Sequence, residues 1–184
     1  IIDDNTLEVF MVEPPIDDGG SNETHYNISL YFPDISSNRP VRSSGQYGTA
    51  PASNANDGDF GRTYPNLFHG EAVAAVSFVD SAWWGVNLAS YVHNPLITVY
   101  ARDCCIGNFG GQLEVWIGND WPSNGVNWNN WNAAKKCGTL SNITDSSTNS
   151  VNCVGSGAYV FIRPSLCSGD TCSLVFAEVV VSNY

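Results

Sequence analysis

Residues 173–181 read SLVFAEVVV, and this stretch is the strongest indication of the fold. It is rich in β-branched residues, which favour the extended conformation of a strand. Stretches of similar character lie at residues 83–88, 96–102, 112–118 and 157–163. No amphipathic helical periodicity is present, and clusters of Gly, Asn, Ser and Pro separate the strand candidates. Many short strands divided by turns predict an all-β protein, built as an antiparallel sandwich or jelly roll.

The 184 residues fit one domain with an appendage better than two domains. We expect residues 39–184 to form the main domain and residues 1–38 an N-terminal extension. Within the extension, alternating runs at 6–12 and 25–32 predict an extra strand pair. A Ser- and Asn-rich linker follows from Pro33 to Pro40.

The formal net charge of −11, from 18 acidic and 7 basic residues, restricts the partners. Nucleic acid is excluded because no basic surface is available to neutralise phosphates. An anionic membrane surface is excluded for the same reason, and no apolar run is long enough to insert into a bilayer. A divalent cation is a more natural counter-ion for such a chain.

The chain has six cysteines, an even number that favours disulfides and an oxidising compartment. They lack the spacing of a zinc site. N-glycosylation sequons at Asn22, Asn27 and Asn142 support the same location, and the protein is expected to be secreted or exposed at a cell surface.

The pairing of the cysteines stays open on geometry alone. Cys137 and Cys153 flank one loop, and Cys167 and Cys172 flank a shorter one. These local pairs would leave the adjacent residues 104 and 105 for each other. Adjacent Cα atoms lie about 3.8 Å apart, whereas ordinary disulfides span roughly 4.4–6.8 Å, so geometry favours other partners for both.

Residues 52–59, ASNANDGD, place many side-chain oxygens in one turn around a glycine. Calcium takes six to eight oxygen ligands from carboxylates, amides and backbone carbonyls, so the turn is a candidate calcium site. It is not an EF-hand loop, because the length and the terminal Glu are missing. The alternative is an ordinary turn rich in Asx residues.

Six motifs, in the same order along residues 39–184, resemble those of F-type lectins (fucolectins), within the discoidin-like, galactose-binding superfamily. They are RSSG with ASNANDGD (42–45 and 52–59), WWGVNL (83–88), YARDCC (100–105), GQLEVWIG (111–118), Cys137-Gly138 with Cys153, and AEV (177–179). The resemblance implies a jelly-roll β-sandwich of about eight antiparallel strands, a structural calcium ion, and a fucose site on loops at one end. Residues 1–38 lie outside it.

The resemblance also assigns residues to the calcium ion. By position, the ligands would be Asn54, Asp57, Asp59 and Glu178, some of them through backbone oxygens. A carboxylate from the distant C-terminal strand would then fix the acidic turn to that strand. The family pattern further implies disulfides Cys137–Cys153 and Cys104–Cys105, the second forming a flat apolar surface against the sugar. Cys167–Cys172 remains the local pairing.

The sugar-site candidates, assigned in the same way, are His69, Arg102, Asp103, Cys104, Cys105 and Asn108. The family motif is only partly kept. Ala101 holds the first Arg position, with Arg102 one place along, and Asn108 replaces a second basic residue. Because charged donors make the strong hydrogen bonds to ligands, the resemblance implies carbohydrate binding without fixing fucose as the sugar.

Five of the six tryptophans divide into two groups. Trp83 and Trp84 are expected to pack in the core or on a strand. Trp121, Trp128 and Trp131 belong to the Asn-rich stretch 119–156, which we expect to be mostly loop. They could stack on sugar rings or pack within the loop.

Two functions remain from these observations. The first is a carbohydrate-binding domain that contains calcium and whose partner is a glycan or glycoprotein. The second is a structural or adhesive subunit of an extracellular assembly, forming a homo- or hetero-oligomer through residues 1–38 by strand addition. The resemblance favours the first. An enzyme is not expected, because GxSxG, HExxH and phosphate-binding glycine loops are missing from the sequence.

Overall fold

The computed structural model describes residues 9–11, 28–30, 32–70, 82–104, 112–122, 131–165 and 173–183. These residues form strands, turns and one 3-10 helix (η1, Ala52–Ala55), with no α-helix among them. No helix in these ranges is long and apolar enough to cross a bilayer. The chain divides into two compact units, Ile1–Pro33 and Asp34–Tyr184.

The smaller unit contains the strand pair that the sequence predicts. Strands β1 (Val9–Met11) and β2 (Ile28–Leu30) pair in antiparallel fashion, with Val9 opposite Leu30. The pairing lies within the two alternating runs of the sequence.

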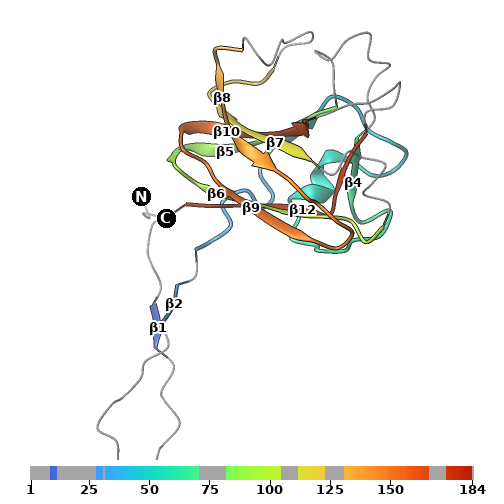
Figure 1. Ribbon diagram of the computed structural model, residues 1–184, viewed down its shortest axis with the longest axis horizontal. Helices are drawn as coiled ribbons and strands as arrows, with labels where there is room; N and C mark the ends of the chain where they lie inside the picture. Colours follow the sequence, from blue (N-terminus) through green and yellow to red (C-terminus); the bar gives the residue numbers. More distant parts are fainter. Residues whose placement is uncertain are drawn as a thin grey trace, which may run out of the picture. The chain divides into compact units, whose positions relative to one another are not determined.

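The larger unit contains two main antiparallel sheets, stacked face to face in Figure 1. The first has five strands, in the order β3 (Val41–Ser43), β5 (Trp84–His93), β10 (Ser156–Pro164), β7 (Leu113–Gly118) and β8 (Ala134–Leu140). The second has three, in the order β12 (Glu178–Ser182), β6 (Leu96–Tyr100) and β9 (Thr148–Asn152). A further pair joins β11 (Leu174–Phe176) to β4 (Phe68–Gly70). The predicted jelly-roll β-sandwich is confirmed.

Alternation along the strands builds the core between the two sheets. Val86, Val160 and Ile117 lie side by side across three strands of the first sheet. They face residues such as Val99 and Val179 of the second sheet within one buried hydrophobic cluster. Burying these side chains is the main source of stability of a sandwich, at about 1.5–3 kcal/mol for each fully buried Val, Leu or Ile.

The outer side of the five-stranded sheet carries a second, aromatic cluster. We call it the outer aromatic cluster, and its members are Trp83, Trp116, Trp121, Trp131, Tyr159 and Phe161. Trp84 is fully buried on the opposite, inner side, where its indole N–H donates to the Ala52 carbonyl at 2.9 Å. Trp121 and Trp131 therefore pack on the sheet, an arrangement that was neither of the two alternatives considered from the sequence. Trp128 lies outside the described residues.

The C-terminal stretch that indicated the fold is two strands rather than one. Leu174–Phe176 pairs with β4, and Glu178–Ser182 pairs with β6 in a different sheet. Ala177 marks the change, and its N–H donates to the Tyr100 carbonyl at 2.8 Å. Because both strands are buried on both faces, their composition carries no sign of the break between them.

Most described residues of the stretch 119–156 lie outside strands, as the sequence predicted, but two strands within it were not predicted. These are β8 and β9, which form edge strands of the two main sheets. Edge strands have one open side and tolerate polar residues, so the Lys, Ser and Asn content of these strands concealed them.

Residues 34–38 belong to the larger unit, although their composition suggested that they are part of a linker and of the N-terminal extension. The Ile35 N–H donates to the Val181 carbonyl at 2.8 Å. The fully buried hydroxyl of Ser36 donates to the Val179 carbonyl at 3.0 Å. Main-chain and side-chain hydrogen bonds thus join this segment to β12.

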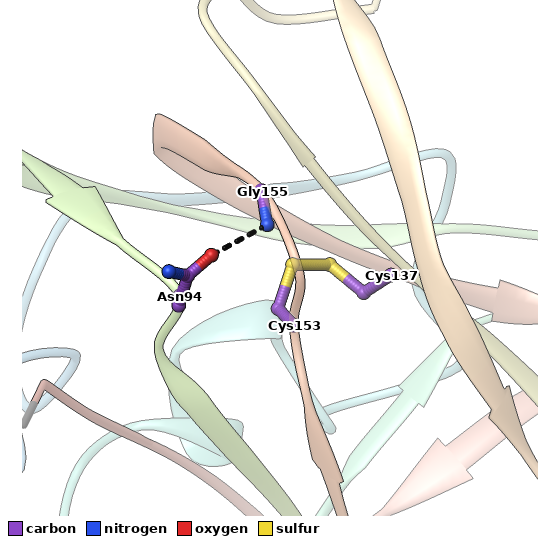
Figure 2. The surroundings of a disulfide bond; sticks show 4 residues. All are labelled: Asn94, Cys137, Cys153 and Gly155. Carbon is purple, nitrogen blue, oxygen red and sulfur yellow. Dashed lines mark hydrogen bonds between the residues drawn. A yellow bond between two sulfur atoms is a disulfide. The ribbon is translucent and has the colours of Figure 1, made fainter.

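The disulfide between Cys137 and Cys153, predicted from the family pattern, is present. Cys137 belongs to β8 and Cys153 follows β9, so the bond joins the edges of the two main sheets. Figure 2 shows Cys153 beside the turn between β5 and β6, where Asn94 Oδ1 accepts the Gly155 N–H at 3.0 Å. The other predicted disulfides, Cys104–Cys105 and Cys167–Cys172, involve residues outside the described part of the chain.

Candidate functional site

The acidic turn after η1 is held by its own carboxylates. Asp57 Oδ1 accepts the Asp59 N–H at 2.8 Å, and Asp59 Oδ1 accepts the Gly61 N–H at 2.8 Å. Gly58 between them has a φ of 82°, a conformation that glycine adopts without steric cost. These bonds place several oxygens on one tight turn, as the sequence predicted.

Glu178 is the distant residue that reaches this turn. It is the first residue of β12, its exposed fraction is 0%, and its Oε1 accepts the Gly58 N–H at 3.2 Å. Its Oε2 is buried and finds no hydrogen-bond partner among the described residues. A buried carboxylate oxygen without a partner is costly, because the lost hydration is not replaced.

The environment of Glu178 disfavours a free negative charge. Burial, above all, raises the pKa of Glu178 to about 8, and the Gly58 N–H only partly opposes this. Repulsion from three nearby carboxylates, Asp57, Asp34 and Asp59, raises it further. The site therefore combines concentrated negative charge with an unpartnered oxygen, the two properties that a bound cation would relieve.

Two asparagines hold the turn against the rest of the unit. Asn54, a predicted ligand, donates through Nδ2 to the carbonyls of Pro65 at 2.6 Å and Leu67 at 3.3 Å. Asn56, 1% exposed, donates through Nδ2 to the Ser36 carbonyl at 2.7 Å. The role of Asn56 could not be predicted from the sequence, since nothing in the composition of an Asx-rich turn distinguishes one Asn from another.

The donors present match a hard cation in type. Among the described residues, no group of three or more His, Cys, Asp or Glu side chains is already arranged as a metal site. Calcium also takes amide and main-chain oxygens, which this turn offers, so carboxylates need not supply the whole set. The buried Glu178 Oε2 is the observation that fits such an ion.

The predicted sugar-site residues fall in two places. Arg102, Asp103 and Cys104 follow β6, and Arg102 Nη2 lies 3.5 Å from Cys104 Sγ. His69 lies in β4, with its ring 4.7 Å from that of Tyr47. Cys105 and Asn108 lie outside the described residues.

Arg62, which the sequence analysis did not identify, lies beside the loop after β6. Its Nη1 donates to the carbonyls of Ala101 at 3.2 Å and Ser147 at 3.3 Å. The Asp103 N–H in turn donates to the Arg62 carbonyl at 3.2 Å. No local motif marks Arg62, because it comes from a segment remote from the Asp-Cys-Cys sequence and meets it only in the folded chain.

Of the three sequons, only Asn142 lies in the described part of the chain. Its side chain is exposed and its φ is 58°, whereas the next residue, Ile143, is buried at 6% exposure. The amide is therefore accessible, and its glycosylation stays a prediction. Asn22 and Asn27 lie outside the described residues.

Solved structures share this fold. A fucolectin from striped bass (Morone saxatilis) serum aligns with a TM-score of 0.66 and 25% identity over 84% of this chain, which spans 50% of that lectin. A fucose-binding module of Streptococcus pneumoniae aligns at 0.60, with 20% identity, covering 83% of this chain and 96% of that one. A chitosan-binding module from a Paenibacillus sp. IK-5 chitosanase/glucanase, solved with chitotriose, aligns at 0.58, with 12% identity, covering 82% and 100%.

No protein-family model and no curated protein sequence matches the chain. The predicted resemblance to F-type lectins, and to the discoidin-like fold they share, is confirmed in three dimensions.

Proposed function

We propose that the larger unit is a non-enzymatic carbohydrate-binding module of a secreted or cell-surface protein, with calcium as a structural ion. The observation that carries this proposal is the fold shared with a fucolectin and with modules that bind fucose and chitosan. The Cys137–Cys153 disulfide supports an oxidising compartment.

The loop after β6 is the proposed sugar site. Arg102 and Arg62 bring two guanidinium groups to this end of the sandwich, and Asp103 supplies a carboxylate. Such groups hydrogen-bond sugar hydroxyls more strongly than neutral donors do. The altered family motif favours a sugar other than fucose.

Calcium, in this proposal, is held by Glu178 and by oxygens of the acidic turn from Asn54, Asp57 and Asp59. When bound, the ion would supply positive charge at the buried Glu178 carboxylate. The residues of the chain would then keep the turn against β12 and so support the neighbouring loop that contains Arg62.

A glycan array with and without chelator tests the proposal. We expect retention on a restricted set of glycans, lost after chelation and restored by calcium. Arg102→Gln should abolish retention without changing the thermal unfolding temperature. Failure of wild-type protein with calcium to bind any glycan would contradict carbohydrate binding.

The second candidate is a subunit of an extracellular assembly. It is favoured by one observation, the separate N-terminal unit with its own strand pair. Removing residues 1–33 and measuring mass by light scattering tests it. An unchanged mass would exclude assembly through these residues, and a fall to the monomer mass would support it.

A further inference from the structure

A cleft opens beside the outer aromatic cluster, and no described residue of the loop that follows β6 lines it. Its volume is about 570 Å³, and it is lined by Arg42 and Ser43 of β3, Gln46, Ser53, Trp83 and Pro122, among others. This size is in the range of small-molecule sites, which combine an apolar wall with a few polar groups. None of the residues assigned to calcium or to the loop site lines it.

The apolar wall of the cleft is an indole. Trp83 stands on the outer side of the five-stranded sheet, and its ring centroid lies 6.5 Å from that of Trp121 and 6.4 Å from that of Phe161. These neighbours fix its orientation, so it presents a rigid, partly exposed surface. A flat aromatic face of this kind suits the apolar face of a sugar ring.

The charged group of the cleft is Arg42. It is exposed, and its guanidinium carbon lies 5.0 Å from the centre of the Trp121 ring. Within the described part of the chain, this guanidinium makes no ion pair and no hydrogen bond. The guanidinium of Arg163, in contrast, is paired with Glu114 at 2.6 Å. An unpaired arginine is unusual in a chain with net charge −11, and its N–H groups remain available.

The sheet beneath is shaped to bring these groups together. Arg42 pairs across the strands with Gly85. A Cβ at Gly85 would lie 2.5 Å from Phe161 Cδ1 and 3.2 Å from Trp121 Cζ3, so the missing side chain lets both rings lie directly on the sheet. The Trp121 ring can then support the Arg42 guanidinium at the edge of the cleft.

We propose that this cleft is a second saccharide site, specific for an anionic sugar. The ring lies against Trp83, and its carboxylate or sulfate pairs with Arg42. Guanidinium binds either anion through two parallel hydrogen bonds. The inference does not depend on the loop site of the proposed function.

Three methyl glycosides test the proposal by NMR titration of the full chain: the β-glucuronide, the neutral β-glucoside and its 6-sulfate. We expect at least one anionic ligand to bind about tenfold more tightly than the glucoside. The shifts should include the Trp83 indole resonance, assigned with Trp83→Phe. The relative affinity of the two anionic ligands distinguishes a carboxylate from a sulfate partner.

Arg42→Gln should remove the preference for the anionic ligand, whereas Arg39→Gln is the matched control. Arg39 is also exposed, its Nε donates to the Ile35 carbonyl at 3.4 Å, and it does not line the cleft. Trp83→Phe should weaken the binding of both the anionic and the neutral glycosides several-fold. The unfolding temperature and the dispersion of the amide resonances show whether this variant is folded. An anion preference that survives in Arg42→Gln, or shifts confined to residues 101–104, would overturn the proposal. The loop site, tested with Arg102→Gln, can fail or succeed separately.

Discussion

Two buried glutamates in this sandwich have opposite surroundings. Glu114 in β7 is 9% exposed and accepts bonds from Lys136 at 2.6 Å, Arg163 at 2.7 Å and Trp116 at 3.2 Å. Glu178 in β12 is fully buried and accepts one bond, from Gly58. Both carboxylate oxygens of Glu114 have partners within the chain. Among the described residues, Glu178 Oε2 has none, so this oxygen is available to a ligand.

Their ionisation differs accordingly. Burial alone would raise the pKa of Glu114, but hydrogen bonds and charges from Lys136 and Arg163 outweigh it and lower that pKa. Burial and neighbouring carboxylates raise the pKa of Glu178 to about 8. A glutamate whose partners are all present is structural, whereas one whose partners are incomplete is a candidate ligand.

Glu114→Gln should cause the largest loss of stability. The amide cannot neutralise Arg163, whose side chain is 11% exposed, so a nearly buried positive charge loses its opposite charge on Glu114. We expect a loss of about 3 kcal/mol in the free energy of unfolding, measured by urea titration. The control is Lys136→Gln, which should lose less than about 1 kcal/mol because that side chain is 40% exposed. Equal losses would contradict this account.

Calcium binding should have the next largest effect on the free energy of unfolding, and only in protein that retains Glu178. At a concentration one hundred times the dissociation constant, a ligand of the folded state adds about 2.7 kcal/mol of stability. We expect chelation to lower the unfolding temperature of wild-type protein and of Lys136→Gln, and to leave Glu178→Gln unchanged. If neither chelator nor calcium changes the unfolding temperature of the wild-type protein, the proposed calcium site is wrong.

In metal-free protein, the two glutamates should give stability opposite dependences on pH. With the pKa of Glu178 raised from 4.5 to about 8, the folded state holds an extra proton between these values. Stability therefore falls as pH rises from about 4.5 to about 8, by at most about 1.4 kcal/mol per pH unit. The lowered pKa of Glu114 makes its contribution present above pH 4.5 and lost as pH falls through its folded-state value.

Denaturant titrations across pH 4 to 8 measure both dependences. Glu178→Gln should remove the decline above pH 4.5, and Glu114→Gln should remove part of the decline in acid. If the stability of Glu178→Gln still falls as pH rises above 4.5, another titrating group causes that fall.

Asp57→Asn should produce the smallest of these effects, a change in the pKa of Glu178. It removes the first of the carboxylates that repel Glu178, while burial, the main cause of the raised pKa, remains. We expect the pKa of Glu178 in metal-free protein to fall by about half a unit, equal to roughly 0.7 kcal/mol. Carboxyl NMR measures it directly, with Asp120→Asn as the control. A rise in the pKa of Glu178 would contradict the repulsion.

The fold class could be predicted from the sequence, because the alternation of apolar and polar residues and the content of β-branched residues favour strands locally. The β-branched stretch after residue 172 contains β11 and β12, and the predicted strand at residues 83–88 lies within β5 from Trp84 onwards. The break at Ala177 could not be predicted, because a strand passing between sheets keeps the same composition on both sides. The edge strands β8 and β9 were also missed, since their solvent-facing sides are polar.

The candidate site was predictable only where motif and geometry coincide. Glu178 could be placed against the acidic turn from the family pattern, and the structure bonds it to Gly58. Arg62, Asn56 and the role of Arg42 could not be found. Each depends on backbone carbonyls or rings supplied by segments far away in sequence, and no spacing rule encodes such neighbours.

The Cys137–Cys153 bond seen in Figure 2 has a consequence for a protein under mechanical load. Stretching the chain from its ends cannot extend the segment between the two sulfurs, which are 16 positions apart. Roughly 55 Å of contour length is thereby withheld from extension in the oxidised protein. Force is transmitted across the covalent bridge instead, so the oxidised chain at full extension is shorter than the reduced chain by this length.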